Sequence, residues 1–217
     1  MYKRQQELLN WAAEEPGRYI IEDDFDCEFR MQGKPIPSIQ SRDRSHRVIY
    51  MNTFSKSLSS TIRISYMVLP IPLMVRYNHV LSFYACTVSN FDQYTLTRFI
   101  QEGYLEKHIN RMRKFYRNSR DRILGCIRSH RLYPQVTIKE ENAGLHFLME
   151  IDTSYTDREM VDRAAAAGIN ISSLSQYCHG KEQEDSHTLV INYSGIEEDI
   201  IEEACDRLLE SVVRLTT

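Results

Sequence analysis

The sequence lacks a long apolar run, which excludes a membrane-crossing helix, because such a helix needs roughly 18 or more consecutive apolar residues. It also lacks an excess of charge, since 27 basic and 30 acidic residues among 217 give a net charge of −3 with histidine neutral. A nearly neutral chain has no general electrostatic attraction to nucleic acid or to an anionic membrane. The remaining composition, 42% hydrophobic and 26% charged, is that of an ordinary globular protein.

Cysteine and glycine are both scarce, and their positions argue against two common kinds of site. The five cysteines are far apart and include no C-x-x-C pair; they are Cys27, Cys86, Cys126, Cys178 and Cys205. An odd, scattered set is typical of reduced thiols in a cytosolic protein, so we expect neither a disulfide framework nor a metal site. The eight glycines include no G-x-x-x-x-G-K-[ST] phosphate loop.

Three predicted strands end in polar residues. The stretch RYIIEDDFDCEF (18–29) runs into a group of acids, and RVIYMNTF (47–54) leads directly to Lys56. A third strand, ISYMVLP (64–70), follows, and a short helix over 3–14 precedes all three. Strands with polar groups at their ends suit an α/β sheet, in which ligands bind beyond the carboxyl ends of the strands.

From about residue 71 to 130 the pattern is helical. In the long helix that closes this region, apolar residues recur at helical spacing: Ile109, Met112, Phe115, Ile123 and Ile127. We interpret its many arginines as a solvated face that pairs with nearby acids, because the chain as a whole is acidic. The run 136–213 then alternates strands with helices, which indicates a small α+β domain after an incomplete α/β domain.

The stretch NTFSKSLSSTIRISYMVLP (52–70) carries the strongest chemical signal. Lys56 lies between two serines, and Arg63 lies in an apolar run, where a buried charge requires an anionic partner. Pyridoxal phosphate (PLP) requires a lysine that can be neutral, an acid at its ring nitrogen, and cations or hydroxyls around its phosphate. Asp23 provides the acid, Lys56 the amine, and Arg63 with Thr53 and Ser55 the phosphate donors.

The acids of residues 22–26 have other interpretations. Clustered carboxylates also bind Mg²⁺ in phosphoryl transfer, although the phosphate loop that accompanies such clusters is missing. They can equally be structural. From the residues alone, PLP binding and purely structural acids both remain open.

Four blocks of the sequence resemble consecutive blocks of one known family. YIIEDDFDCEFR, GKPIPS, VIYMNTFSKSLSSTIRISYMVLP and YLEKHINRMRKFYRNSRDRIL are similar to the aminotransferase-like domain of MocR/GabR-type regulators of the GntR family. The resemblance covers roughly residues 1 to 130 strongly and the rest more weakly. It implies an α/β fold: an incomplete fold type I aminotransferase large domain, with a mostly parallel sheet, followed by a small α+β domain. The expected boundaries are 1–105 for the large domain, 106–133 for a connecting helix and 134–217 for the small domain.

The resemblance also implies a role for each candidate site residue. Lys56 matches the lysine that bonds to PLP, and Asp23 matches the aspartate that faces the pyridine nitrogen. Arg63 matches the phosphate arginine, and Thr53 and Ser55 match hydroxyl positions that flank the phosphate.

Two positions depart from the family pattern. Phe25 stands where the family commonly has a tyrosine that hydrogen-bonds the 3′-oxygen of PLP, so we expect it to contact the cofactor through packing alone. Strand alternation puts residues 21, 23 and 25 on one side of the chain and 22, 24 and 26 on the other. Val190 stands where aminotransferases usually have an arginine for the substrate carboxylate.

Three functions remain possible at this point. The first is an effector-sensing, PLP-binding domain of a MocR/GabR-like regulator, without its DNA-binding domain and the first half of its aminotransferase domain. The second is a class I/II aminotransferase acting on amino acids and 2-oxo acids, and the third is a remnant that binds no cofactor. The resemblance implies an amino acid or amine effector, a homodimer, and DNA binding only through a helix-turn-helix domain absent from this chain.

Overall fold

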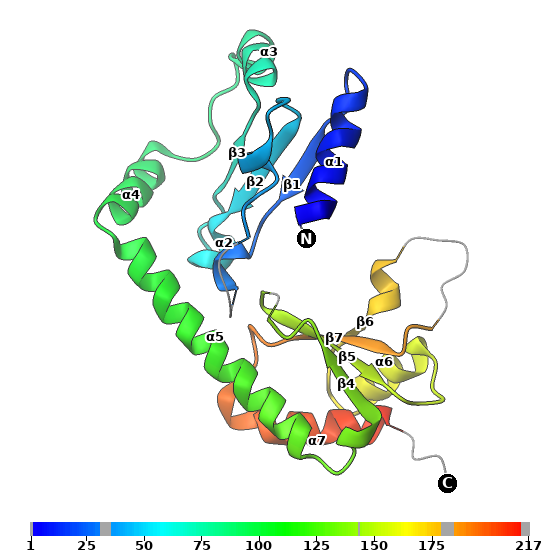
Figure 1. Ribbon diagram of the computed structural model, residues 1–217. Coiled ribbons are helices and arrows are strands. Elements are labelled where there is room, and N and C mark those ends of the chain that lie inside the picture. The colour runs from blue at the N-terminus through cyan, green and yellow to red at the C-terminus, as the bar shows by residue number, and fades with distance from the viewer. Residues whose placement is uncertain (1, 31–35, 143, 179–184, 214–217) are drawn as a thin grey trace. The chain divides into compact units, whose positions relative to one another are not determined.

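Residues 2–30, 36–142, 144–178 and 185–213 are described by the computed structural model of the chain (Figure 1). The chain divides into two compact units, Met1–Glu28 with Gly33–Arg111 and Phe29–Gln32 with Met112–Thr217. The predicted domain boundaries, at residues 105 and 133, stay predictions. Within the described residues, no helix combines the length and the apolarity that crossing a membrane requires.

The first unit begins with helix α1 (Tyr2–Glu14) and a three-stranded sheet. The strands are β1 (Ile20–Asp23), β2 (Val48–Thr53) and β3 (Ser65–Val68), in the order β1-β2-β3. β1 pairs with β2 in parallel, and β2 pairs with β3 in antiparallel orientation. The short helix α2 (Phe54–Ser57) follows β2 directly. The predicted first helix and the three predicted strands are therefore confirmed.

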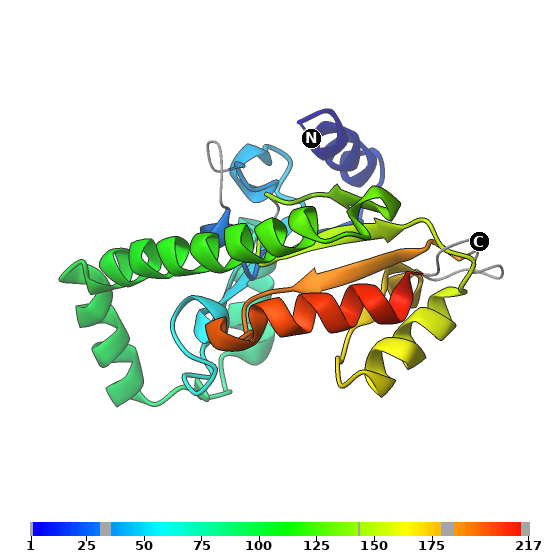
Figure 2. The ribbon, with the colours of Figure 1, turned by 90° about the horizontal axis from the view of Figure 1, so that it is seen from below.

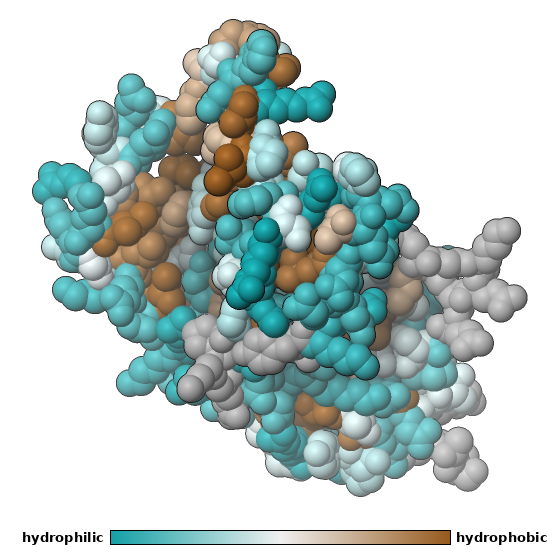
Figure 3. All heavy atoms as spheres, turned by 45° about the horizontal axis from the view of Figure 1, so that its top comes forward, coloured by the Kyte–Doolittle hydropathy of each residue, from teal (hydrophilic) through white to brown (hydrophobic). Residues whose placement is uncertain are grey.

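Helices α3 (Ile71–Leu81) and α4 (Asn90–Gln101) complete the first unit, together with the start of α5 (Tyr104–Ser129). Their apolar side chains are largely exposed; Phe91 of α4, for example, is 79% exposed. Figure 3 shows brown, apolar residues gathered over this part of the unit. A soluble protein rarely leaves so many aromatic and aliphatic side chains uncovered unless they meet a partner surface.

The second unit contains the larger core. Its sheet consists of β4 (Val136–Lys139), β5 (His146–Ile151), β6 (Ser172–Ser173) and β7 (Thr188–Asn192), in the antiparallel order β4-β5-β7-β6. Helices α6 (Asp157–Ala166) and α7 (Ile201–Val212) belong to the same unit. The inward side of β5 is fully apolar, consisting of Phe147, Met149 and Ile151. The predicted small α+β region is present.

Helix α7 and the later part of α5 lie along this sheet (Figure 2). Arg122 of α5 and Glu202 of α7 form an ion pair between them, with an N–O distance of 2.7 Å. The predicted apolar stripe of α5 is wrong at Phe115, which is exposed, whereas its neighbour Tyr116 is buried. Tyr116 lies seven residues before Ile123, two helical turns away on the same face, whereas Phe115 lies about 100° further round.

A buried carboxylate binds the start of α6 to the segment before β7. Asp157 is only 3% exposed, and its side chain accepts hydrogen bonds from the backbone N–H groups of Ser186 (3.1 Å) and His187 (2.8 Å). Burial acts to raise the pKa of Asp157, but hydrogen bonds from Ser175, Ser186 and His187 outweigh it and hold the pKa below its usual value. The ionised form of Asp157 is therefore a part of the fold.

We predict that Asp157→Asn destabilises the protein by about 1–3 kcal/mol at pH 7, because it leaves buried donors poorly paired. Because its folded-state pKa is lowered, the Asp157 carboxylate stabilises the folded protein fully at pH values above its unfolded-state pKa of about 4. This stabilisation is lost as the pH falls through the folded-state pKa. The difference between variant and wild type should therefore shrink below about pH 4 in urea denaturation. Asp162→Asn, on the exposed face of the same helix, is the matched control. A difference independent of pH would contradict this account.

Candidate functional site

The carboxyl ends of β1 and β2 lie next to each other. Asp23, the last residue of β1, is paired with Met51 of β2, and the Asp24 N–H donates to the Met51 carbonyl at 3.0 Å. Exposure alternates along this segment as predicted: Ile21, Asp23 and Phe25 are exposed, whereas the residues between them are half-buried. Asp23 and Phe25 therefore share the outward side.

Two of the other three acids at residues 22–26, Glu22 and Asp24, have structural partners. The carboxylate of Glu22 accepts hydrogen bonds from the backbone N–H groups of Ile39 (2.7 Å) and Gln40 (2.9 Å). The carboxylate of Asp24 accepts from the Tyr50 hydroxyl at 3.1 Å. These acids turn away from Asp23, so the carboxylates do not converge in the way that a magnesium cluster requires. Asp23 is left as the exposed acid at the strand end.

A network of hydroxyl groups holds the turn after β2. Thr53 caps α2: its Oγ1 accepts a hydrogen bond from the Ser55 N–H (3.2 Å) and lies 3.1 Å from Ser55 Oγ. The same Oγ1 lies 3.2 Å from the Ile64 carbonyl, which also accepts from the Phe54 N–H at 2.9 Å. Lys56 is the exposed third residue of α2. The network thus ties the start of α2 to the residue that follows Arg63.

Arg63 differs from the sequence-based expectation. Its side chain is exposed, whereas its neighbours Ile62 and Ile64 are half-buried, so the predicted burial of Arg63 is wrong. The φ angle of Arg63 is +40°, in the left-handed region that non-glycine residues avoid at a cost of about 1 kcal/mol or more. Such strain concentrates at functional sites.

Sequence reasoning missed the buried residue Asn52. It is 4% exposed, and its Nδ2 lies 3.1 Å from the Tyr50 hydroxyl and 3.4 Å from Glu28 Oε1, while its Oδ1 accepts from the Thr53 N–H. Burial raises the pKa of the nearby Cys27 thiol to about 12 and also raises the pKa of Tyr50. This network connects β2 to the segment after β1. A single amide inside an otherwise apolar strand is the signal that marks it.

In the second unit, Val190 lies at the middle of β7. Its neighbours on the flanking strands are Leu148 of β5 and Ser172 of β6. A valine side chain offers no donor to a carboxylate, so this position cannot act as the bidentate fork that an arginine provides.

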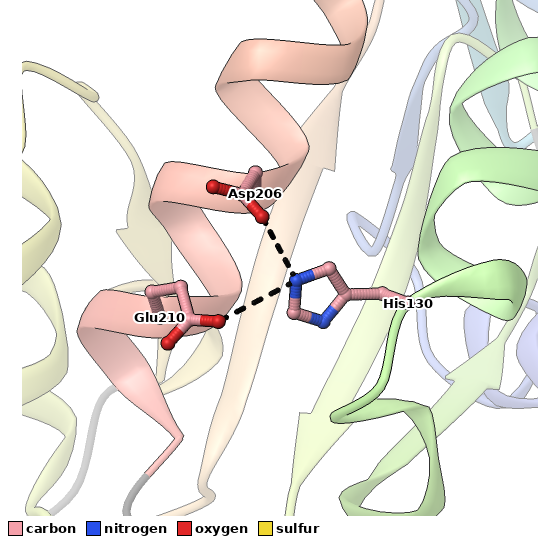
Figure 4. Close-up of side chains that lie close together, drawn as sticks. All are labelled: His130, Asp206 and Glu210. Carbon is pink, nitrogen blue, oxygen red and sulfur yellow. Dashed lines mark hydrogen bonds and ion pairs between the residues drawn. The ribbon is translucent and has the colours of Figure 1, made fainter.

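A cluster of His130, Asp206 and Glu210 has the composition of a metal site, the only such cluster among the described residues (Figure 4). His130 Nε2 lies 3.2 Å from Asp206 Oδ1 and 3.7 Å from Glu210 Oε1. However, the Leu132 N–H donates to His130 Nδ1 at 3.2 Å, so the neutral ring carries its proton at Nε2. Arg131 also binds both oxygens of Glu210. The cluster is therefore better explained as a contact that holds α7 to the turn after α5.

The chain is similar in sequence to regulators of the helix-turn-helix (HTH) type. It is 42% identical over 206 residues to the HTH-type transcriptional regulator YdeL of Bacillus subtilis, a match that covers 94% of this chain and 43% of YdeL. It is 33% identical over 198 residues to the probable rhizopine catabolism regulatory protein MocR of Rhizobium meliloti, a match that covers 91% of this chain and 39% of MocR. No family model matches the chain. The chain thus spans less than half of these regulators.

Its fold is similar to that of a solved aminotransferase. Kynurenine aminotransferase of Pyrococcus horikoshii matches with a TM-score of 0.81 and 29% identity, over 97% of this chain and 51% of that enzyme. The chain therefore has part of the fold of the fold type I aminotransferases, as predicted. By sequence it belongs with the MocR-type regulators and corresponds to their aminotransferase-like region.

We predict that Asn52→Ala lowers the free energy of unfolding by about 1–3 kcal/mol, because it removes a buried donor and acceptor from three partners. Guanidinium denaturation measures the change. Asn170→Ala is the control, since Asn170 is an exposed asparagine of the second unit. Equal stability of the two variants would contradict a structural role for the Asn52 network.

Proposed function

We propose that the chain is the effector-sensing, PLP-binding part of a MocR/GabR-like transcriptional regulator. The main support is the corner at the carboxyl ends of β1 and β2, where an exposed acid, amine and guanidinium accompany a hydroxyl pair. These groups are Asp23, Lys56, Arg63, Thr53 and Ser55. The similarity to YdeL and MocR favours a regulator as the parent protein.

The donor set of this corner suits PLP. Arg63 and the hydroxyls of Thr53 and Ser55 would bind the phosphate, and the Asp23 carboxylate would hold the proton on the ring nitrogen. Lys56 would attach the cofactor through its Nζ. When bound, PLP supplies an electron sink for reactions at the α-carbon of an amino acid. The strained φ of Arg63 is consistent with a residue held in place for a ligand.

Two residues favour sensing over turnover. Phe25 shares the outward side with Asp23 but has no hydroxyl to donate to the 3′-oxygen. Val190 has no charge with which to bind a substrate carboxylate. A sensor needs only a difference in effector affinity between two states of the protein, so the loss of these groups is tolerable in a regulator.

The alternative is an active class I/II aminotransferase, which the similarity to the Pyrococcus horikoshii enzyme supports. A third candidate is a remnant that binds no cofactor. Cofactor binding separates the remnant from both others, and product formation separates the enzyme from the sensor.

Partners follow from the same proposal. The effector would be an amino acid or amine, and DNA would be bound through the HTH domain of the parent protein. The exposed apolar side chains of α3 and α4, such as Val75 and Phe91, support self-association as a homodimer, because their burial would be favourable. A cytoplasmic location fits a transcriptional regulator.

We predict that amino acids or amines change the visible absorbance of the PLP-loaded protein without net production of a 2-oxo acid. The measurement is a titration with a panel of amino acids and amines, with the 2-oxo acid quantified in parallel. Steady catalytic formation of a 2-oxo acid would favour the aminotransferase. The absence of any cofactor absorbance in the loaded full-length parent would favour the remnant.

We predict that Asp23→Asn weakens PLP binding and shifts the cofactor spectrum more than Asp24→Asn does. Asp23 faces outward, whereas Asp24 accepts a hydrogen bond from the Tyr50 hydroxyl, so Asp24→Asn should mainly reduce stability. Spectral titration with PLP and thermal unfolding of both variants separate the two effects. A larger spectral change in Asp24→Asn would show that the opposite face of the strand binds the ring.

A further inference from the structure

A cleft lies in the first unit, between α1 and the loop before β2. Its volume is about 470 Å³, which is within the range of small-molecule sites. One wall is a single face of α1 with the spacing i, i+3, i+4, i+7, and it consists of Gln6, Leu9, Asn10 and Ala13. The other wall is the loop of residues 41–45.

The one carboxylate among the residues that line the cleft is hydrogen-bonded within its own loop. The carboxylate of Asp43 accepts hydrogen bonds from the backbone N–H groups of Ser45 (2.8 Å), Arg47 (2.6 Å) and Val48 (2.8 Å). The Asp43 carboxylate therefore stabilises the conformation of its own loop. The remaining charges that line the cleft are the guanidinium groups of Arg42 and Arg44.

The donors around the cleft are fixed to different degrees. Arg42 Nη1 donates to Gln5 Oε1 of α1 at 3.2 Å, which anchors one guanidinium beside the helix. Arg44 is exposed, and Ser41 and Ser45 add hydroxyl groups. On the opposite wall, Gln6 and Asn10 are hydrogen-bonded to each other at 2.9 Å and carry no charge. The lining thus combines two positive groups, one carboxylate that is hydrogen-bonded within its own loop, and neutral donors.

We propose that this cleft binds the phosphate group of a small phosphate monoester. The two guanidinium groups outweigh the single Asp43 carboxylate, so the lining is net positive. A phosphate, with a charge of about −2 and three acceptor oxygens, is the kind of group that arginine binds through paired N–H donors. A carboxylate carries half that charge and has one oxygen fewer. The cleft has room for the organic part of the molecule beside the apolar Leu9 and Ala13.

This cleft is separate from the proposed cofactor corner. It lies at the amino end of β2, whereas Thr53 and Lys56 lie at its carboxyl end. The strand between them rises about 3.3 Å per residue, so the two ends are about 17 Å apart. The inference does not rest on the proposed function, and it holds whether or not the protein binds PLP.

Calorimetric titration with glycerol 3-phosphate at constant ionic strength tests the proposal. The full chain with Arg63→Gln is the parent for the test, so that phosphate binding at the cofactor corner does not contribute. We expect Arg44→Gln to weaken binding at least about tenfold, the effect of removing a charge-assisted hydrogen bond worth about 1.4 kcal/mol or more. Arg76→Gln, an exposed arginine of α3 outside the cleft, should leave the affinity unchanged.

Three results would overturn the proposal. If Arg44→Gln and its parent bound glycerol 3-phosphate with equal affinity, the phosphate would not bind in the cleft. If Arg76→Gln lost as much affinity as Arg44→Gln, the binding would reflect general charge attraction. Displacement of the phosphate ester by a short DNA duplex, with the same dependence on Arg44, would assign the cleft to a nucleic acid. Tight, Arg44-dependent binding of glycerol 3-phosphate alone supports it.

Discussion

The parallel pairing of β1 with β2 is the constraint on which the candidate site depends. It brings Asp23, at the end of one strand, beside Met51, two residues before the end of the other. The turn that carries Lys56 then begins at Thr53. The Thr53 hydroxyl and the Phe54 N–H both donate hydrogen bonds to the Ile64 carbonyl. If β1 slipped by one residue relative to β2, a different acid would face outward at the strand end.

Around this pairing, buried and half-buried polar groups fix the backbone and leave other side chains exposed for a ligand. Glu22 and Asp24 bind within the fold, and Asn52 links β2 to the segment after β1. Because these groups are satisfied internally, Asp23 and Lys56 remain exposed without weakening the strands. The second unit has a hydrophobic core of its own, and the ionised Asp157 binds the start of α6 to the segment before β7.

Part of this arrangement could be predicted from the sequence. Period-two alternation places Asp23 and Phe25 on one side because it depends on neighbouring residues alone. Apolar spacing also predicted the helices, but it misplaced Phe115, since two adjacent aromatic residues fit the pattern almost equally well. The exposure of Arg63 could not be predicted, because it depends on a left-handed backbone angle rather than on composition. The role of Asn52 was missed because Glu28, its partner across the fold, comes from another segment of the chain.

The central claim is that the corner after β2 holds PLP through Lys56. The most direct test is to load the full-length parent protein with PLP, fix the lysine–cofactor bond with borohydride, and map the modified peptide by mass spectrometry. The account predicts that the modification falls on Lys56 and disappears in Lys56→Arg. Modification of another lysine, at a yield unchanged in Lys56→Arg, would contradict it.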